Sequence, residues 1–295
     1  MPTLRRLLVT LLALLLPACA PLDAPAANAA EAWHGPAIWK VADKDTTIYL
    51  FGTIHALPDN GTWFTGPVAR AFGGSQELVT EFVNMGNVSD AIRDRGRLPP
   101  GTTLRSLLKP DERMKFEETL VSFGVPVEAL DSYKPWYAAF VLTNMEAQKA
   151  GFDVQSGPET VLAANAGNRQ QAGLETVQQQ IDIFDGLPQA EQLAFLNETV
   201  ATISQASATL DAYYAKWMAG DADGLAVMLN AELDDPLLHK RLLTDRNARW
   251  AQWIDRRLQQ PGTVFVAVGA GHLAGSDSVQ QQLKKRGIKA RRVWD

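Results

Sequence analysis

The stretch that decides the fold is residues 263–272, which read TVFVAVGAGH. Its first six residues are almost continuously apolar, as expected for a parallel strand that is covered on both faces. A Gly-x-x-His sequence, from Gly269 to His272, follows this strand at once. A predicted helix at residues 277–286 and a predicted short strand at residues 289–293 come next. The order of the pattern is therefore strand, Gly-x-x-His, helix, strand.

A second segment near the start of the chain repeats this order. Residues 46–51, TTIYLF, are β-branched and aromatic, which is typical of a strand, and they run into the Gly-x-x-His of residues 52–55. A short helix is predicted at residues 68–72 and a strand at residues 77–82. Crossovers of this kind build sheets that are covered by helices and bind ligands at the carboxyl ends of their strands. The two units predict an α/β fold with a central, mostly parallel sheet.

The two units are separated by a large, mostly helical insertion, at roughly residues 88–260. Pro110 and Pro135 are placed where helices begin, because proline is well accepted in the first helical turn. Residues 170–174 are a candidate for one short strand within this insertion. We expect a single domain, residues 33–295, in which the insertion forms a lid or a groove wall.

Composition narrows the classes of partner. The chain has 295 residues, of which 46% are hydrophobic and 21% charged, and its formal net charge is -5. These fractions are those of an ordinary globular protein and exclude a disordered or collagen-like chain. A negative net charge argues against a nucleic-acid partner, which would require a basic face. We expect a peptide or small-molecule partner instead, and the single cysteine excludes an intramolecular disulfide.

The first 19 residues have the features of a secretory signal peptide. Arg5 and Arg6 form a short basic head, and residues 7–16 are apolar except for Thr10. This apolar run is too short to span a bilayer as a helix. A basic head followed by a short apolar run and small residues is typical of an export signal. We therefore expect an exported, periplasmic protein.

Cys19 follows the sequence LPA of residues 16–18, an order that resembles a bacterial lipoprotein box. In this interpretation Cys19 becomes a lipidated N-terminus that anchors the protein to the membrane. The alternative is free secretion, with cleavage after Ala29. Residues 20–32 consist mainly of Ala, Pro and Asp without periodicity, and they are predicted to be a tether.

Two histidines and a glutamate form the candidate metal centre. His55 and His272 occupy matching positions, and adjacent parallel strands would bring them together. Glu81 lies between two valines on one face of a predicted strand, where a carboxylate is unfavourable unless it is paired with a helix or bound to a metal. Two histidines and one carboxylate can hold Zn²⁺, Mn²⁺ or Fe²⁺ and leave positions for water and substrate. The other histidines, His34 and His239, do not follow a strand-end glycine.

Arg246 is the second unusual feature. In the predicted helix at residues 237–258, it shares one face with a leucine and two tryptophans. A guanidinium on an apolar face requires a carboxylate or a bound anion, unless its long chain carries the head out to water. Asn247 is adjacent and could supply an amide. Glu175 could be a carboxylate at a helix N-terminus or an acid that supports the site.

These motifs, in this order, resemble the TraB/PrgY/GumN family, whose animal relatives are the TIKI proteins. The resemblance implies a fold related to erythromycin esterase and the haem-binding ChaN proteins. Through TIKI it also implies a metal-dependent peptidase that uses the two Gly-x-x-His histidines and a glutamate. PrgY members are linked to pheromone shutdown and GumN members to the xanthan gene cluster, so the family does not define a substrate. The matching segments are 51–58 (FGTIHALP), 78–81 (LVTE), 173–177 (GLETV), 245–247 (DRN) and 268–273 (VGAGHL).

The leading hypothesis is a metal-dependent hydrolase of the cell envelope, most simply a peptidase. A divalent ion, with zinc, manganese and cobalt as the first candidates, would activate a bound water. Two alternatives remain: a protein that sequesters a peptide or other ligand without turnover, and an accessory factor in envelope polysaccharide production. The expected metal ligands are His55, Glu81 and His272, and the expected catalytic residues are Glu175, Arg246 and Asn247.

Overall fold

The protein is built around a six-stranded sheet in the order β4-β3-β5-β2-β1-β6. The computed structural model describes residues 33–59, 61–83, 88–231 and 236–293. The predicted signal peptide, lipoprotein box and tether lie outside these residues. The strands are β1 (Ile38–Ala42), β2 (Thr46–Thr53), β3 (Glu77–Thr80), β4 (Gln170–Gly173), β5 (Gly262–Gly269) and β6 (Arg291–Arg292).

The four strands from β4 to β2 run parallel to one another, which confirms the predicted α/β fold. β1 is antiparallel to both of its neighbours, β2 and β6. It was not expected from the sequence, and it forms a hairpin with β2. The turn of this hairpin is closed by Asp43, whose carboxylate accepts hydrogen bonds from the backbone N–H groups of Asp45 and Thr46.

The two crossovers leave the centre of the sheet in opposite directions. β2 leads through α1 (Gly66–Gly73) to β3, and β5 leads through α13 (Val279–Lys285) to β6. Helix α1 packs on the sheet face that carries Phe51, whereas α13 packs on the opposite face, which carries Ile48. In α/β sheets, the point at which adjacent parallel strands send their crossovers to opposite faces is the usual ligand site. Here that point lies at the carboxyl ends of β2 and β5.

β3 is shorter than the strand predicted at residues 77–82. It ends at Thr80, whose hydroxyl donates a hydrogen bond to the carbonyl of Phe82 at 2.8 Å. A side chain that bonds the backbone two residues later competes with the strand ladder and favours a bend. Glu81 therefore lies just beyond the carboxyl end of β3, level with the ends of β2 and β5.

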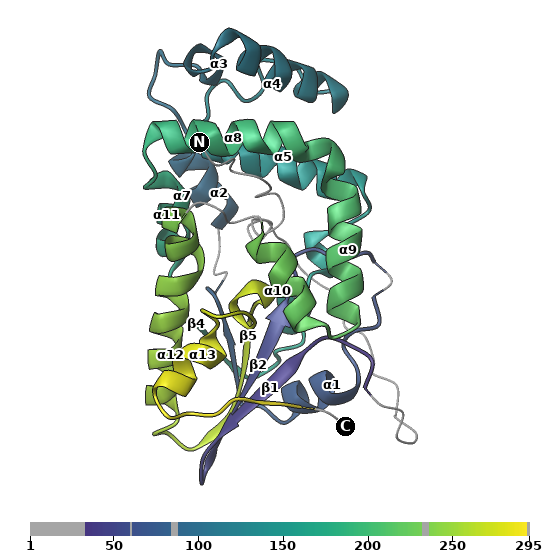
Figure 1. Ribbon diagram of the computed structural model, residues 1–295, viewed down its shortest axis with the longest axis vertical. Helices are drawn as coiled ribbons and strands as arrows, with labels where there is room; N and C mark the ends of the chain where they lie inside the picture. Colours follow the sequence, from purple (N-terminus) through teal and green to yellow (C-terminus); the bar gives the residue numbers. More distant parts are fainter. Residues whose placement is uncertain (1–32, 60, 84–87, 232–235, 294–295) are drawn as a thin grey trace.

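Most helices form a layer beyond the carboxyl ends of the strands. Figure 1 shows α3, α4, α5 and α8 at the end of the molecule towards which the arrowhead of β2 points. In contrast, α12 packs on the sheet beside α13. The bounds are α2 (Val88–Arg95), α3 (Leu104–Leu107), α4 (Pro110–Ser122), α5 (Pro135–Lys149), α6 (Pro158–Ala164), α7 (Val177–Asp185), α8 (Gln189–Thr202), α9 (Ala206–Met218), α10 (Ala222–Asn230), α11 (Pro236–His239) and α12 (Asp245–Arg257).

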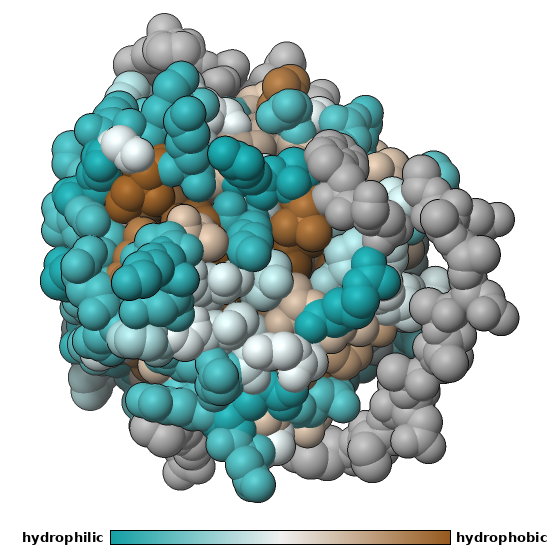
Figure 2. Space-filling view, turned by 90° about the horizontal axis from the view of Figure 1, so that it is seen from below, coloured by the Kyte–Doolittle hydropathy of each residue, from teal (hydrophilic) through white to brown (hydrophobic). Residues whose placement is uncertain are grey.

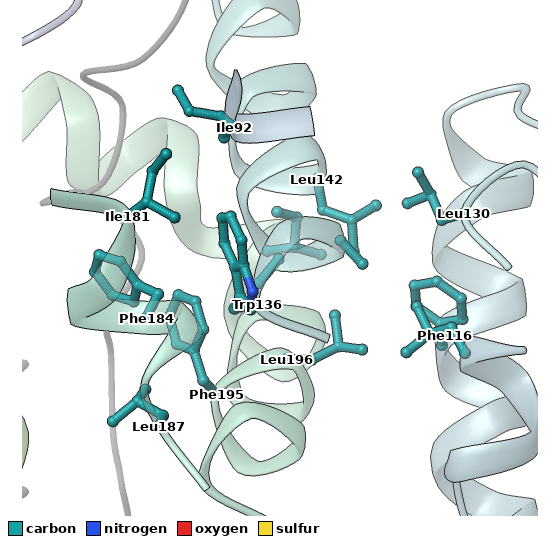
Figure 3. Packing of buried hydrophobic residues seen from close by; sticks show 14 of the residues in the cluster. Ile92, Phe116, Leu130, Trp136, Leu142, Ile181, Phe184, Leu187, Phe195 and Leu196 are labelled. Atoms are coloured by element: carbon teal, nitrogen blue, oxygen red, sulfur yellow. The ribbon is translucent and has the colours of Figure 1, made fainter. Parts of the chain in front are cut away.

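The helical layer has a hydrophobic core of its own. Figure 3 shows Trp136 of α5 at its centre, near Phe184 of α7 and Phe195 of α8. Trp136 is fully buried, and its indole N–H donates to a carboxylate oxygen of Asp185 at 3.1 Å. Phe184 and Phe195 stack with ring centroids 5.9 Å apart. This packing holds α5, α7 and α8 together as one unit beside the sheet.

The surface at the end away from this layer is mostly hydrophilic, with hydrophobic side chains showing only in small patches (Figure 2). Across the part of the chain that the structure describes, no helix is long and apolar enough to cross a membrane.

Candidate functional site

The site lies where three adjacent parallel strands end. Thr53 of β2 and Gly269 of β5 form the last pair of the β2–β5 register, and His55, Glu81 and His272 lie just past the ends of their strands. Gly269 is the point at which they meet. A Cβ atom on Gly269 would lie 3.2 Å from Glu81 Oε1, 3.6 Å from His272 Cδ2 and 3.7 Å from His55 Nε2. Glycine serves close approach here and not a left-handed turn, since its φ is −50°.

Arg246 lies at the centre of a buried charge cluster. Its Nε donates to both carboxylate oxygens of Glu175, at 3.1 and 3.0 Å, and its Nη2 donates to Glu81 Oε2. The amide of Gln180 bridges the same two carboxylates, at 3.0 Å from Glu81 and 2.9 Å from Glu175. Arg246 is only 4% exposed, so its head does not reach water. The carboxylate partner expected for this guanidinium is in fact a pair of carboxylates.

A local irregularity of the helix orients Arg246. Residues Lys240–Thr244 form a π-helical turn between α11 and α12, and Arg246 follows it in the first turn of α12. Nη1 of Arg246 donates to the carbonyl of Leu242 within this turn, at 3.2 Å. Wide helical turns are frequent at functional sites because they redirect side chains and free carbonyl groups.

His272 is held as a neutral imidazole of one tautomer. The amide nitrogen of Asn247 donates to the carbonyl of Asp277 at 2.9 Å, so its oxygen faces His272 Nδ1, 2.6 Å away. Nδ1 must therefore carry the proton, and the lone pair of Nε2 accepts a hydrogen bond from Arg246 Nη1 at 3.1 Å. Burial, assisted by the charge of Arg246, lowers the pKa of His272 to about 3.

His55 has a different environment. Its Nδ1 lies 2.7 Å from Glu159 Oε1, which also accepts a hydrogen bond from the hydroxyl of Thr53. Nε2 has no hydrogen-bond partner among the described residues, and His55 lines the pocket. Burial alone would lower the pKa of His55, but the carboxylate of Glu159 outweighs it and raises the pKa above its ordinary value. A carboxylate on Nδ1 directs the basic lone pair of Nε2 towards the pocket.

Burial alone would raise the pKa of the Glu81 carboxyl. This effect is outweighed only by several others acting together, first the charge of Arg246, then both histidines and the backbone N–H of Gly269, which donates at 2.8 Å. The pKa of Glu81 is therefore held well below its usual range, and Glu81 is an anion at every physiological pH.

A pocket of about 1090 Å³, counted with its open mouth, lies over this centre. Its floor is polar and carries His55, Glu81, Arg246 and His272. Among the described residues, these are the acidic, basic and imidazole side chains of the lining; Tyr213 also lines the pocket, whereas Glu175 and Asn247 do not. The walls are apolar and come from α5, α7, α9, α10 and the π-helical turn. They include Phe140, Phe152, Phe184, Leu210, Leu229 and Leu243.

The predicted metal ligands lie close together but, as arranged, do not fit a metal ion. The one lone pair of His272 Nε2 is used by Arg246, and so is Glu81 Oε2. His272 Nε2 and Glu81 Oε1 are 3.9 Å apart. In the described ranges, no group of three or more His, Cys, Asp or Glu side chains is placed to hold a metal.

Two functional candidates were missed at the level of sequence, Glu159 and Gln180. Glu159 follows Gly157 and Pro158, and a Cβ on Gly157 would lie 2.2 Å from the carbonyl oxygen of His55. The signal was a Gly-Pro-Glu sequence that begins a helix, but only the fold shows what it packs against. Gln180 lies in the first turns of α7, one turn after Glu175, and nothing local distinguishes it from its glutamine neighbours.

Most of the chain is similar to known proteins. The model of the TraB/PrgY/gumN family matches residues 37–292. An uncharacterized protein of Treponema pallidum (strain Nichols) is 24% identical over 270 residues, covering 84% of this chain and 80% of its own. The uncharacterized protein YbaP of Escherichia coli (strain K12) is 24% identical over 256 residues, covering 84% of this chain and 92% of YbaP. Metalloprotease TIKI2 of Danio rerio is 26% identical over 297 residues, covering 82% of this chain and 57% of TIKI2. No solved structure was found to match the chain.

Proposed function

Because this chain belongs to the TraB/PrgY/gumN family, and because one relative is named a metalloprotease, we propose that it hydrolyses peptide bonds. The observation that supports this most directly is the environment of His55. Its Nδ1 is bound to the carboxylate of Glu159, and its Nε2 is open to the pocket beside Glu81 and Arg246. An imidazole backed by a carboxylate is a suitable general base for activating water.

In the proposed reaction, His55 Nε2 takes a proton from a water whose oxygen attacks the carbonyl carbon of the substrate. As the C–O bond forms, the carbonyl oxygen becomes negative. Nη2 of Arg246 has one N–H that no described residue uses, and it donates to this oxygen. His55 then returns the proton to the leaving nitrogen as the C–N bond breaks. Glu175 and Asn247 act as positioning residues, because they hold Arg246 and His272.

The pocket favours an uncharged substrate segment with an apolar side chain. In the described lining, Glu81, Arg246 and His272 are each bound on two or more sides by other groups of the protein. Among the described residues, the lining offers no free ammonium or carboxylate group to bind a chain terminus. The aromatic and aliphatic walls instead offer a surface for a Phe or Leu side chain next to the cleaved bond.

The test of this function is cleavage of a peptide library by the purified full chain, with the sites of cleavage read by mass spectrometry. We expect internal cleavage next to apolar residues. Peptides that are retained without cleavage would instead support the sequestering protein. Cleavage confined to charged termini would contradict the proposed use of the pocket.

Gly269→Ala is expected to lower the rate of hydrolysis about tenfold, because the new methyl group, 3.2 Å from Glu81 Oε1, would displace groups at the reacting centre, where small misplacements have large effects. The backbone of Gly269 suits alanine, so the fold should persist, but the new methyl group would lie among Glu81, His272 and His55. The control is Gly73→Ala, where a Cβ would meet nothing within 4 Å. Equal activity of both variants would show that the reaction takes place elsewhere.

The place of action is proposed from the sequence of the first 19 residues. If Cys19 is lipidated, metabolic labelling with a fatty acid marks the protein, and Cys19→Ser releases it in soluble form. The measurement is the mature N-terminus together with the label. A mature N-terminus at or after Ala20 would contradict the anchor and favour free secretion.

A further inference from the structure

We infer that the cation at the centre of this site is the guanidinium of Arg246, and that the centre works without a bound metal ion. The first reason is geometric. A metal ion bound to His272 would lie about 2.1 Å from Nε2 along its single lone pair. Arg246 Nη1 already lies 3.1 Å from that nitrogen and uses the lone pair. The two cations would therefore compete for one place.

Because of its tautomer, His272 cannot bind a metal ion through its other ring nitrogen. Its Nδ1 carries a proton that is donated to Asn247, whose amide is itself fixed by the carbonyl of Asp277. The imidazole thus has no second lone pair to offer an ion. Glu81 is committed at three of its four lone pairs, since Oε1 accepts from the backbone N–H of Gly269 and Oε2 accepts from Arg246 and Gln180.

The second reason is charge. Glu81 and Glu175 are both 7% exposed, and together they carry two negative charges. Arg246 binds both of them, and Arg249 binds Glu175 from the surface at 3.1 Å. Two positive charges therefore already balance the two carboxylates. A divalent ion next to Arg246 would meet a guanidinium at close range, and in a buried site that repulsion is strong. The remaining carboxylate at the site, Glu159, is bound to Nδ1 of His55 and not to the Nε2 that faces the pocket.

The inference predicts that the site will bind a metal ion once the guanidinium is removed. Arg246→Ala would free the lone pair of His272 Nε2 and the oxygens of Glu81 and Glu175, with His55 Nε2 close by. Histidine nitrogens and carboxylate oxygens in this number are a suitable zinc-binding set. The variant should therefore acquire a metal site that the natural chain does not have.

The experiment measures zinc bound by the full chain after incubation with zinc sulfate and dialysis, together with the midpoint of thermal unfolding. We expect the natural chain to retain far less than one zinc ion and Arg246→Ala to retain about one per chain. Zinc at a hundredfold excess over its Kd should raise the unfolding midpoint of Arg246→Ala by about 5–10 °C and leave the natural chain unchanged. The matched control is Arg249→Ala, which removes the exposed partner of Glu175, keeps Arg246 and should gain no zinc.

The natural chain alone can overturn the inference, even if Arg246→Ala does not fold. One zinc ion per natural chain, lost in both His55→Ala and His272→Ala, would show that the metal displaces Arg246. Failure of Arg246→Ala, once folded, to bind zinc would also contradict it. Since zinc content is measured without turnover, these outcomes are independent of whether the protein proves to be a peptidase.

Discussion

Replacing His55 by glutamine is expected to lower the rate of hydrolysis about 10²- to 10⁴-fold, the usual contribution of a general base. Glutamine is close to histidine in size, and its amide can still donate to Glu159, so the fold should be kept. What it cannot do is accept a proton at the position of Nε2. The measurement is kcat/KM for the best peptide, with circular dichroism as the check of folding.

The matched control is His239→Gln, because His239, the last residue of α11, contacts Thr244 and Asp277 and does not line the pocket. That variant should keep its activity. A His55→Gln variant that is folded and fully active would contradict the assignment of the base.

Glu159→Gln tests the pair of His55 and Glu159 in a second way, through the pH dependence of the rate of hydrolysis. Glu159 raises the pKa of His55, and a general base acts only in its unprotonated form. Activity should therefore rise as pH increases through the pKa of His55. Without the carboxylate, burial dominates and the pKa falls, so the acidic limb of the profile should move to lower pH. A residue with only a structural role would change the rate but not the position of this limb.

The largest effect on stability is expected for Trp136→Ala, which should lower the free energy of unfolding by about 3–5 kcal/mol. Trp136 is fully buried at the centre of the helical layer, where it contacts Phe140, and its N–H is bonded to Asp185. Truncation to alanine leaves a cavity among the helices and removes one of the two hydrogen bonds that Asp185 Oδ1 accepts, the other coming from Lys134. The measurement is unfolding by urea monitored by circular dichroism.

The control is Trp253→Ala on α12, where the side chain is only partly buried. It should have less than half the effect of Trp136→Ala, because less apolar surface is lost from the core. Equal losses of unfolding free energy in the two variants would show that the core of the helical layer adds little to stability. Trp136 contacts Phe140, which lines the pocket together with Phe184. Trp136→Ala should therefore raise KM in any fraction that stays folded.

Much of the fold could be predicted from local pattern. The repeated strand, Gly-x-x-His, helix, strand order was enough to expect parallel strands and their crossovers, because apolar runs and glycine turns are local signals. The order of the strands was not predictable in this way. β5 lies between β2 and β3, and this arrangement depends on which helix packs on which face of the sheet.

The residues of the candidate site could be predicted from the sequence, but the hydrogen bonds between them could not. The strand-end glycines and the unusual places of Glu81 and Arg246 identified the residues that now lie together. The sequence did not indicate that Arg246 binds His272 and Glu81 itself, because that depends on a π-helical turn and on the tautomer set by Asn247. Glu159 was missed because it lies in a helix far along the chain and meets His55 only through a glycine that permits close packing.

The position of β5 has a consequence for how the chain is made. This strand begins at Gly262, after most of the chain has been synthesised, yet it is the strand that β2 and β3 both pair with. Until it arrives, two hydrophobic strands have no central partner, and pairings between distant parts of a chain form slowly and leave edges exposed to aggregation. A chain that stops before residue 262 lacks the middle of the sheet and His272 together. The proposed site can therefore assemble only after β5 has been made and has paired with β2 and β3.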